Sequence, residues 1–239
     1  MKVFNIVTDK KFLHEKCEEV TFPINEEDKN LLLDMVEYLK ISQDEELSEK
    51  YKIRPGVGLA ANQVGVKKRM IAIYFVDEKG EINQYGLVNP KLVSYSVKQS
   101  CLDSGEGCLS VPKDIEGYVY RYYKVTVKGF DVLTNKEVTI KARDYLSIIL
   151  QHELDHLDGL LYVDRIDKKD PFKNKDLYLK YRKEYQEIIN SQEGLTLTPL
   201  TISNLTILES KIEFELSYNK KDANKNKVLT ELFKLLKGE

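Results

Sequence analysis

The chain has 239 residues, of which 42% are hydrophobic and 32% are charged, and its formal net charge is −2. This length is sufficient for one domain with a substantial core and a smaller appendage, and the composition is typical of a soluble globular protein. A net charge so close to zero gives no global electrostatic reason for tight binding to DNA, to RNA or to an anionic membrane.

The cysteine content and the lack of long apolar runs favour a cytoplasmic protein with no membrane partner. No apolar run approaches the ~18 residues of a membrane span, and the first residues lack the apolar core of a signal peptide. Cys17, Cys101 and Cys108 are an odd, scattered set, which favours reduced thiols over a disulfide framework. We expect Cys17 and Cys101 to be ordinary core residues.

Helical and extended segments follow one another in the first half of the chain. Apolar residues at helical spacing predict a helix over 26–39, and the charged stretch 42–52 is compatible with a second, short helix. The glycines of GVGLAANQVG (56–65) indicate a bent, closely approached backbone. Residues 70–76 predict a strand that continues through a DEKG turn into extended residues 85–97.

In the second half of the chain, the spacing of apolar residues is first typical of strands and then typical of a helix. Alternating residues and a turn at LTNKE predict strands over 117–140. After them, apolar residues at spacings of three and four predict a helix over 145–157, ended by Gly159 as its C-cap. A Tyr-rich amphipathic segment predicts a further helix over about 173–190.

A change of composition after Asn190 divides the chain into a main domain, 1–190, and a C-terminal extension, 191–239. The extension contains a predicted strand at KIEFELS and a basic helix at VLTELFKLLK, separated by an Asn/Lys linker. Lysines of this kind usually form a solvated face, but a basic helix can also contact RNA, so we also consider a ribosome contact.

Two of the three histidines lie four positions apart, in QHELDH. On a helix, His152 and His156 are one turn apart on the same face, so both imidazoles can bind one metal ion. Glu153 projects from the adjacent face, where it can take a proton from a water molecule, as in the HExxH pattern. His14 has no partner at ligand spacing, and we expect a surface or capping role for it.

Two imidazoles are too few, because catalytic metal sites of this kind usually have three protein ligands and keep one position open. Cys108 in SGEGCLSVP is the strongest candidate for the third ligand. A thiolate is a soft, tight ligand, and the flanking Gly105 and Gly107 allow a close approach of the backbone.

Three motifs stand in order along the chain: GVGLAANQ (56–63), EGCLS (106–110) and QHELDH (151–156). Together they closely resemble peptide deformylase, and the likeness extends over roughly residues 1–170. SQDEELSEKYKIRP before the first motif and GYVYR after the second resemble the longer class found in Gram-positive-type bacteria.

The resemblance implies an α+β fold in which antiparallel strands pack around a central metal-binding helix. It implies a hydrolase that removes the formyl group from the N-terminal formyl-methionine of nascent polypeptides. Cys108, His152 and His156 match the metal ligands of the family, and Glu153 matches its general acid/base. Gln63 matches the glutamine whose amide, with the backbone N–H of Leu109, receives the oxyanion.

The resemblance also implies where the substrate binds. A peptide can pair its main chain with the strand around Val57 and Gly58, and Gly107 is expected at the same site. Tyr145, Ile148 and Ile149 fall where the family lines its methionine pocket, although as apolar helix residues they are equally plausible core.

A supporting residue and the metal are further expectations. We place Asp155 behind the ligands, paired with Arg121 so as to steady the helix. A Cys/His₂ set suits zinc, iron, nickel or cobalt, and the resemblance implies that the native ion is Fe²⁺.

Two other functions are compatible with the metal-binding residues alone. An HExxH zinc peptidase would use a third His or Glu downstream, and no further His follows His156. A non-catalytic binding protein with a structural metal would normally supply four ligands, and we identify no fourth.

Overall fold

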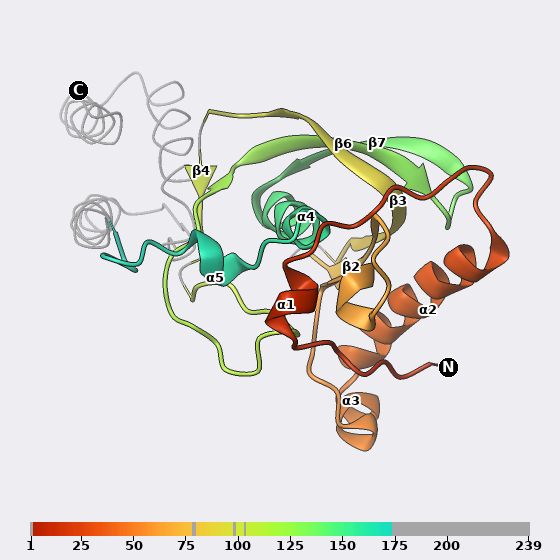
Figure 1. Cartoon of the computed structure of the whole chain (residues 1–239), viewed down its shortest axis with the longest axis horizontal. Helices are drawn as coiled ribbons and strands as arrows, with labels where there is room; N and C mark the ends of the chain where they lie inside the picture. Colours follow the sequence, from red (N-terminus) through yellow and green to blue (C-terminus); the bar gives the residue numbers. More distant parts are fainter. Residues whose placement is uncertain (1, 78–79, 98, 103, 174–239) are drawn as a thin grey trace, which may run out of the picture. The chain divides into compact units, whose positions relative to one another are not determined.

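The computed structural model describes residues 2–77, 80–97, 99–102 and 104–173 (Figure 1). These residues form two compact units. The described parts of the first unit are 2–77, 80–97, 107–115 and 122–165, and those of the second are 99–102, 104–106, 116–121 and 166–173. The predicted domain boundary, the elements assigned to 191–239 and nearly all of the predicted helix 173–190 lie outside the described residues.

Among the described helices, α2 and α4 are long and the others are short. Their bounds are α1 Lys10–Leu13, α2 Glu26–Ser42, α3 Glu45–Tyr51, α4 Asp144–Leu157 and α5 Tyr162–Arg165, with a 3₁₀ turn, η1, at Ala61–Val64. The strands are β1 Gly58–Ala60, β2 Met70–Val76, β3 Ile82–Tyr95, β4 Gln99–Ser100, β5 Arg121–Tyr122, β6 Lys124–Asp131 and β7 Lys136–Arg143.

Five of the strands form one antiparallel sheet in the order β1-β2-β3-β6-β7, and β4 pairs with β5. β2 pairs with β3, with Ile71 opposite Leu87, and at the two described residues of the predicted DEKG turn the Gly80 N–H donates to the Asp77 carbonyl at 2.9 Å. β6 and β7 are joined through the predicted LTNKE turn. The expected α+β fold, with antiparallel strands around the QHELDH helix, is confirmed.

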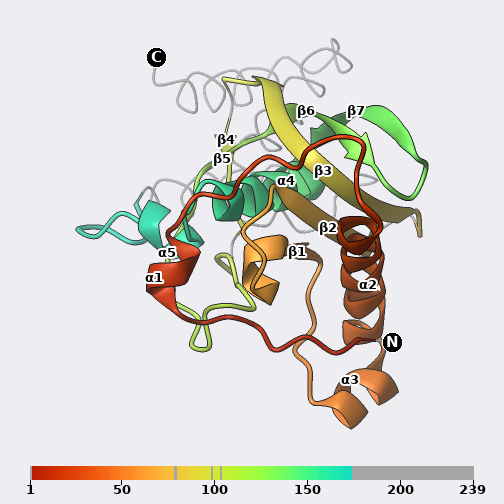
Figure 2. The same ribbon diagram turned by 45° about the vertical axis from the view of Figure 1, so that its right-hand side comes forward.

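The sheet is covered by α2 on one face and by α4 on the other (Figure 2). Side chains alternate between the two faces of a strand, so a strand buried on both faces has few polar positions. Ile71 and Ile73 of β2 pack in one cluster with Leu150 of α4, while Met70 and Ala72 pack in the other with α2. This double burial explains the nearly continuous apolar run of β2.

The ends of the helices follow from local chemistry. The Asn25 side chain accepts a hydrogen bond from the Asp28 N–H and caps α2, which extends three residues beyond the predicted 26–39. α4 ends at Leu157 with Asp158 as its C-cap, one residue before the predicted cap Gly159, which follows with φ +73°. A Cβ on Gly159 would overlap the carbonyl oxygen of His14, so both the backbone angle and the space require glycine.

None of the helices in the described part of the chain combines the length and the hydropathy that a membrane-spanning helix needs.

Candidate metal centre

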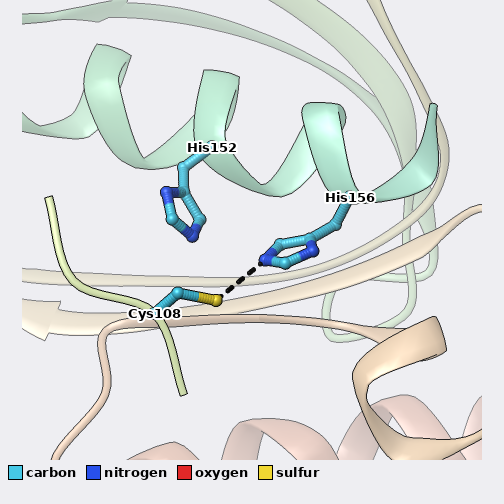
Figure 3. Close-up of side chains that lie close together, drawn as sticks. All are labelled: Cys108, His152 and His156. Carbon is cyan, nitrogen blue, oxygen red and sulfur yellow. Dashed lines mark hydrogen bonds between the residues drawn. The ribbon is translucent and has the colours of Figure 1, made fainter. Parts of the chain in front are cut away.

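α4 presents His152 and His156 toward the loop that carries Cys108 (Figure 3). The two imidazole centroids are 5.1 Å apart, as the spacing of one helical turn predicts. The Cys108 sulfur lies 3.2 Å from His156 Nε2, and each of the three residues offers a ligand atom within 4.8 Å of the others. Residues distant in sequence therefore converge on one point.

The donor set fits a divalent transition-metal ion. Sulfur and nitrogen ligands of a tetrahedral ion, at about 2.3 and 2.1 Å from it, lie roughly 3.6 Å apart, which is close to the observed separation of Cys108 and His156. Thiolate and imidazole together select zinc or a similar first-row ion over magnesium or calcium. Among the described residues this is the one such cluster of ionisable side chains that could hold a metal.

The two other thiols have a different setting. Cys17 and Cys101 are buried, and no cysteine forms a disulfide. Cys17 packs in the core between the sheet and α4, where burial raises the pKa of its thiol from 9.0 to about 11. The expectation that these two are core residues is confirmed.

Gln63 lies beside Cys108 and is held in one orientation. It belongs to η1 and is 2% exposed. Its Oε1 accepts the Ala60 N–H at 2.8 Å, so the Nε2 donor is directed at Ser110 Oγ, 3.1 Å away, and Cys108 Sγ, 3.4 Å away. The amide hydrogens of Gln63 therefore point into the site.

Glu153 is buried beside β1, with 3% of its surface exposed. Its side chain occupies the space where residue 58 would carry a Cβ: a Cβ there would stand 2.8 Å from Glu153 Cδ. At this distance the carboxylate would have to move, so Gly58 leaves the space that the Glu153 side chain occupies. Leu109, which follows Cys108, is half-buried and packs toward α2.

The residues expected to bind substrate lie around this point in different environments. β1, with Gly58, is the terminal strand of the sheet, and the Val57 carbonyl extends its pairing by accepting the Tyr74 N–H at 3.0 Å. Ile149 is part of the core cluster with α4, and Ile148 is buried outside both clusters. Tyr145 is 40% exposed.

Gly107 has open space around it. A Cβ on Gly107 would meet only Asp114 Oδ1, at 3.7 Å, which is an ordinary contact. The packing of the described residues therefore does not itself demand glycine at this position, in contrast to Gly58.

The expected pairing of Asp155 with Arg121 is wrong, because the structure gives each residue a different ion-pair partner. Asp155 binds Arg165 ten residues along the chain. Arg121 makes a bidentate ion pair with Glu106 at 2.8 and 2.9 Å, and both side chains are buried. The first pair ties α4 to α5, whereas the second stabilises the second unit.

Sequence reasoning missed three residues that position the site. Asn62 donates to the His156 carbonyl at 2.7 Å and so fixes the end of α4. Arg54 donates to the Val111 carbonyl at 3.0 Å and binds Asp114, which holds the loop after Cys108. Ser110 contacts Gln63. Asn62 and Ser110 had a signal in the sequence, because they lie within the motifs GVGLAANQ and EGCLS, whereas Arg54 lies in neither.

His14 acts as the expected capping residue. It is the C-cap of α1, where its Nδ1 contacts the Lys10 carbonyl at 2.6 Å, and its Nε2 lies 3.1 Å from Asp164.

Comparison with known proteins gives one family. The sequence profile described as "Polypeptide deformylase" matches residues 3–172. "Peptide deformylase 2" of Geobacillus stearothermophilus is 49% identical over 164 residues, which are 69% of this chain and 89% of that protein. "Peptide deformylase 2" of Bacillus subtilis (strain 168) is 50% identical over 170 residues, 71% of this chain and 92% of that protein.

Solved structures give the same result. A crystal structure of peptide deformylase from Ehrlichia chaffeensis matches with a TM-score of 0.58 at 30% identity, covering 79% of this chain and 100% of that one. A second structure of that enzyme, in complex with actinonin, matches with a TM-score of 0.58 at 32% identity, covering 77% and 98%. The chain belongs to the polypeptide deformylase family, metal-dependent hydrolases that remove the formyl group from the N-terminal formyl-methionine of new polypeptides.

Proposed function

We propose that this chain performs deformylation with Cys108, His152 and His156 as metal ligands, Glu153 as general acid/base, and Gln63 with the Leu109 N–H as oxyanion donors. The observation that carries the proposal is the convergence of one thiol and two imidazoles next to a buried carboxylate and an oriented amide.

A divalent ion bound there supplies a Lewis acid that makes a water molecule acidic enough to act as the nucleophile near neutral pH. Glu153 takes a proton from that water and later delivers it to the departing nitrogen. The water oxygen becomes bonded to the formyl carbon and the C–N bond breaks. The products are formate and a protonated amine, because the second proton of the water leaves the formic acid and is taken up by the released amine.

The negative charge that develops on the formyl oxygen needs donors fixed in advance. The hydrogen bond from the Ala60 N–H to Oε1 of Gln63 orients the amide so that the hydrogens on Nε2 face Ser110 and Cys108. A single preorganised donor of this kind is typically worth about 3–4 kcal/mol of transition-state stabilisation. The neutral amide also adds no competing base.

Substrate recognition follows from β1 and α4. β1 is the edge of the sheet, so the main chain of a peptide can add beside Val57 and Gly58 without reading its side chains. Ile148 lies one helical turn before His152, on the ligand-bearing face of α4. With Ile149, Tyr145 and the backbone at Gly107, it forms the proposed pocket for the methionine side chain.

We propose Fe²⁺ as the native ion, with Zn²⁺, Ni²⁺ or Co²⁺ able to occupy the same Cys/His₂ set. A cytoplasmic location suits such a site, because a reducing compartment protects both ferrous iron and the Cys108 thiolate.

The test is release of formate from a formyl-Met peptide by protein loaded anaerobically with Fe²⁺ or Ni²⁺. Glu153→Gln is expected to keep its metal and lose about 10²–10⁴-fold in kcat. Cys108→Ala is expected to lose the metal itself. Glu49→Gln, a change in α3, serves as the matched control.

Two results would contradict the proposal. One is cleavage of internal peptide bonds without formate release, which would indicate a peptidase. The other is undiminished turnover in a metal-loaded Glu153→Gln variant, which would remove Glu153 from the reaction.

A further inference from the structure

α5 carries a buried tyrosine that contacts one of the residues of the candidate metal centre. Tyr162 is the first residue of α5, and 1% of its surface is exposed. Its ring stacks on the imidazole of His152, with the ring centroids 6.1 Å apart and an angle of 23° between the two planes. That separation lies within the range of about 4.5–7 Å over which nearly parallel, offset aromatic rings attract each other. Tyr162 therefore supports a proposed metal ligand without being a ligand itself.

The hydroxyl of Tyr162 reaches the loop that carries the third proposed ligand. It accepts a hydrogen bond from the Ile115 N–H at 2.9 Å. Ile115 follows Cys108 in the loop between β4 and β5. One side chain thus contacts both segments that supply the ligands, the helix with the imidazoles and the loop with the thiol, although these segments are distant in sequence.

α5 is held in place by contacts at its other residues, so Tyr162 stands on a fixed support. Asp155 of α4 binds Arg165 of α5. Asp164 of α5 lies 3.1 Å from Nε2 of His14, the C-cap of α1. Because α5 is tied to both helices and the ring of Tyr162 is buried, this ring has little freedom to turn.

The two imidazoles differ in how the protein holds them. His156 is 1% exposed, its Nε2 lies 3.2 Å from the Cys108 sulfur, and its backbone carbonyl accepts a hydrogen bond from Asn62. His152 is only partly buried, and its ring makes a T-shaped contact with His156 and a stacked contact with Tyr162. A partly buried side chain has fewer neighbours to fix its rotamer, so the flat face of Tyr162 matters more for His152 than any single contact does for His156.

We propose, on the basis of the function proposed above, that Tyr162 is a positioning residue that keeps His152 oriented for metal binding. A free imidazole turns about two side-chain bonds, and this freedom is lost when one of its nitrogens binds an ion. A ligand that is already held in the bound orientation loses less freedom, so the ion is bound more tightly. Residues that support metal ligands from behind are typically worth about 10–100-fold in metal affinity.

The test compares Tyr162→Met with Tyr38→Met in the full-length protein. Both tyrosines are buried, with 1% and 2% exposed, but Tyr38 belongs to α2 on the other face of the sheet, where its ring contacts Phe4. Both variants should lose stability in urea. Only Tyr162→Met should bind Zn²⁺ about 10–100-fold more weakly, as measured by competition with a chelating dye. The visible absorption bands of bound Co²⁺, which report the geometry of its ligands, should change in Tyr162→Met alone.

Tyr162→Phe separates the ring from the hydroxyl. This variant keeps the surface that stacks on His152 and removes the group that binds Ile115. Its Zn²⁺ affinity should lie between those of the parent and Tyr162→Met, and its Co²⁺ bands should stay close to those of the parent. Because the change in volume is small, the phenylalanine variant also provides the test if the methionine variant does not fold.

Two results would overturn the role of Tyr162. One is a Zn²⁺ affinity equal to that of the parent in either Tyr162 variant. The other is an equal loss of affinity in Tyr38→Met, which would mean that any loss of stability weakens metal binding. Formate release from a formyl-Met peptide is a separate measurement, so failure of the proposed reaction would be seen as a metal-loaded parent that releases no formate.

Discussion

α2 and α4 cover opposite faces of the same sheet, but they bury different chemistry. Two of the eight buried residues of α2 are polar or charged, Asp28 and Ser42. In α4 the proportion is five of ten, namely Ser147, Gln151, Glu153, Asp155 and His156. Burial of polar groups is costly unless they are hydrogen-bonded, so the two helices must be stabilised in different ways.

α4 carries its polar face because neighbouring elements bind it. Gln151 accepts the Tyr122 N–H at 2.9 Å and donates to the Tyr122 carbonyl at 2.9 Å. Asp155 binds Arg165, and Asn62 binds the His156 carbonyl. α2 instead contributes apolar packing through residues such as Leu32 and Leu39. α2 therefore contributes mainly to the stability of the fold, and α4 carries the groups that take part in the chemistry. Each of the following substitutions tests whether these two contributions are independent.

The largest expected effect comes from Gly58→Ala, on the α4 side. The new Cβ would displace the Glu153 carboxylate, so kcat should lose a large part of the about 10²–10⁴-fold that general acid–base catalysis contributes. The change should be nearly silent when introduced into Glu153→Gln, since the displaced group is already absent. Formate-release kinetics of the two single variants and the double variant test this. Additive losses would show that Gly58 acts through something other than Glu153.

On the α2 side, Leu32→Ala should reduce stability and leave the chemistry unchanged. Leu32 is fully buried, and loss of such a side chain typically costs about 2–5 kcal/mol of unfolding free energy. The adjacent Leu33 is 37% exposed, so Leu33→Ala should stay within about 0.5 kcal/mol. Urea unfolding and kcat of the folded protein are the two measurements. A drop in kcat comparable to the drop in stability would mean that the two faces are coupled.

The same contrast explains which features the sequence predicts. Apolar periodicity is a local property, so it predicted α2, α4 and the strands to within a few residues. Three motifs in a fixed order predicted which residues meet at Cys108. The extension of α2 to Ser42 was missed because the added turn continues without the apolar spacing that marked its beginning.

Pairings between distant residues could not be predicted in the same way. Arg121 and Arg165 are equally plausible partners for Asp155 in the sequence, and only their positions in space distinguish them. Likewise, the sequence indicates that Gly58 is in a bent segment, but the space taken by Glu153 depends on how α4 packs against β1. Arg54 holds the Cys108 loop with no local pattern to mark it.

A smaller effect is expected when the polar face of α4 loses one of its supports. Asp155→Asn should lower the unfolding free energy by about 1 kcal/mol, because Asp155 is buried but Arg165 remains partly in water. Asp158→Asn, which weakens the more exposed pair with Arg69, should cost less. Metal content and the midpoint of urea unfolding are measured for both variants and for the parent protein. Loss of metal from Asp155→Asn alone would give this carboxylate a direct role in holding the ligands.

The last effect appears only at alkaline pH and concerns the apolar part of the α4 side, where Cys17 is buried. In the folded protein the pKa of this thiol is about 11, against 9.0 when the chain is unfolded. Between these pH values only the unfolded chain releases the proton, so stability falls as pH rises through this window. Cys17→Ala should remove the loss of stability that comes from this thiol, and its unfolding free energy should approach or pass that of the parent between pH 9 and 11.

Urea unfolding at a series of pH values measures the difference between the two proteins, which cancels the titration of tyrosines and lysines common to both. Parallel curves would mean that the thiol reaches solvent and that this part of the core is more open than its packing indicates.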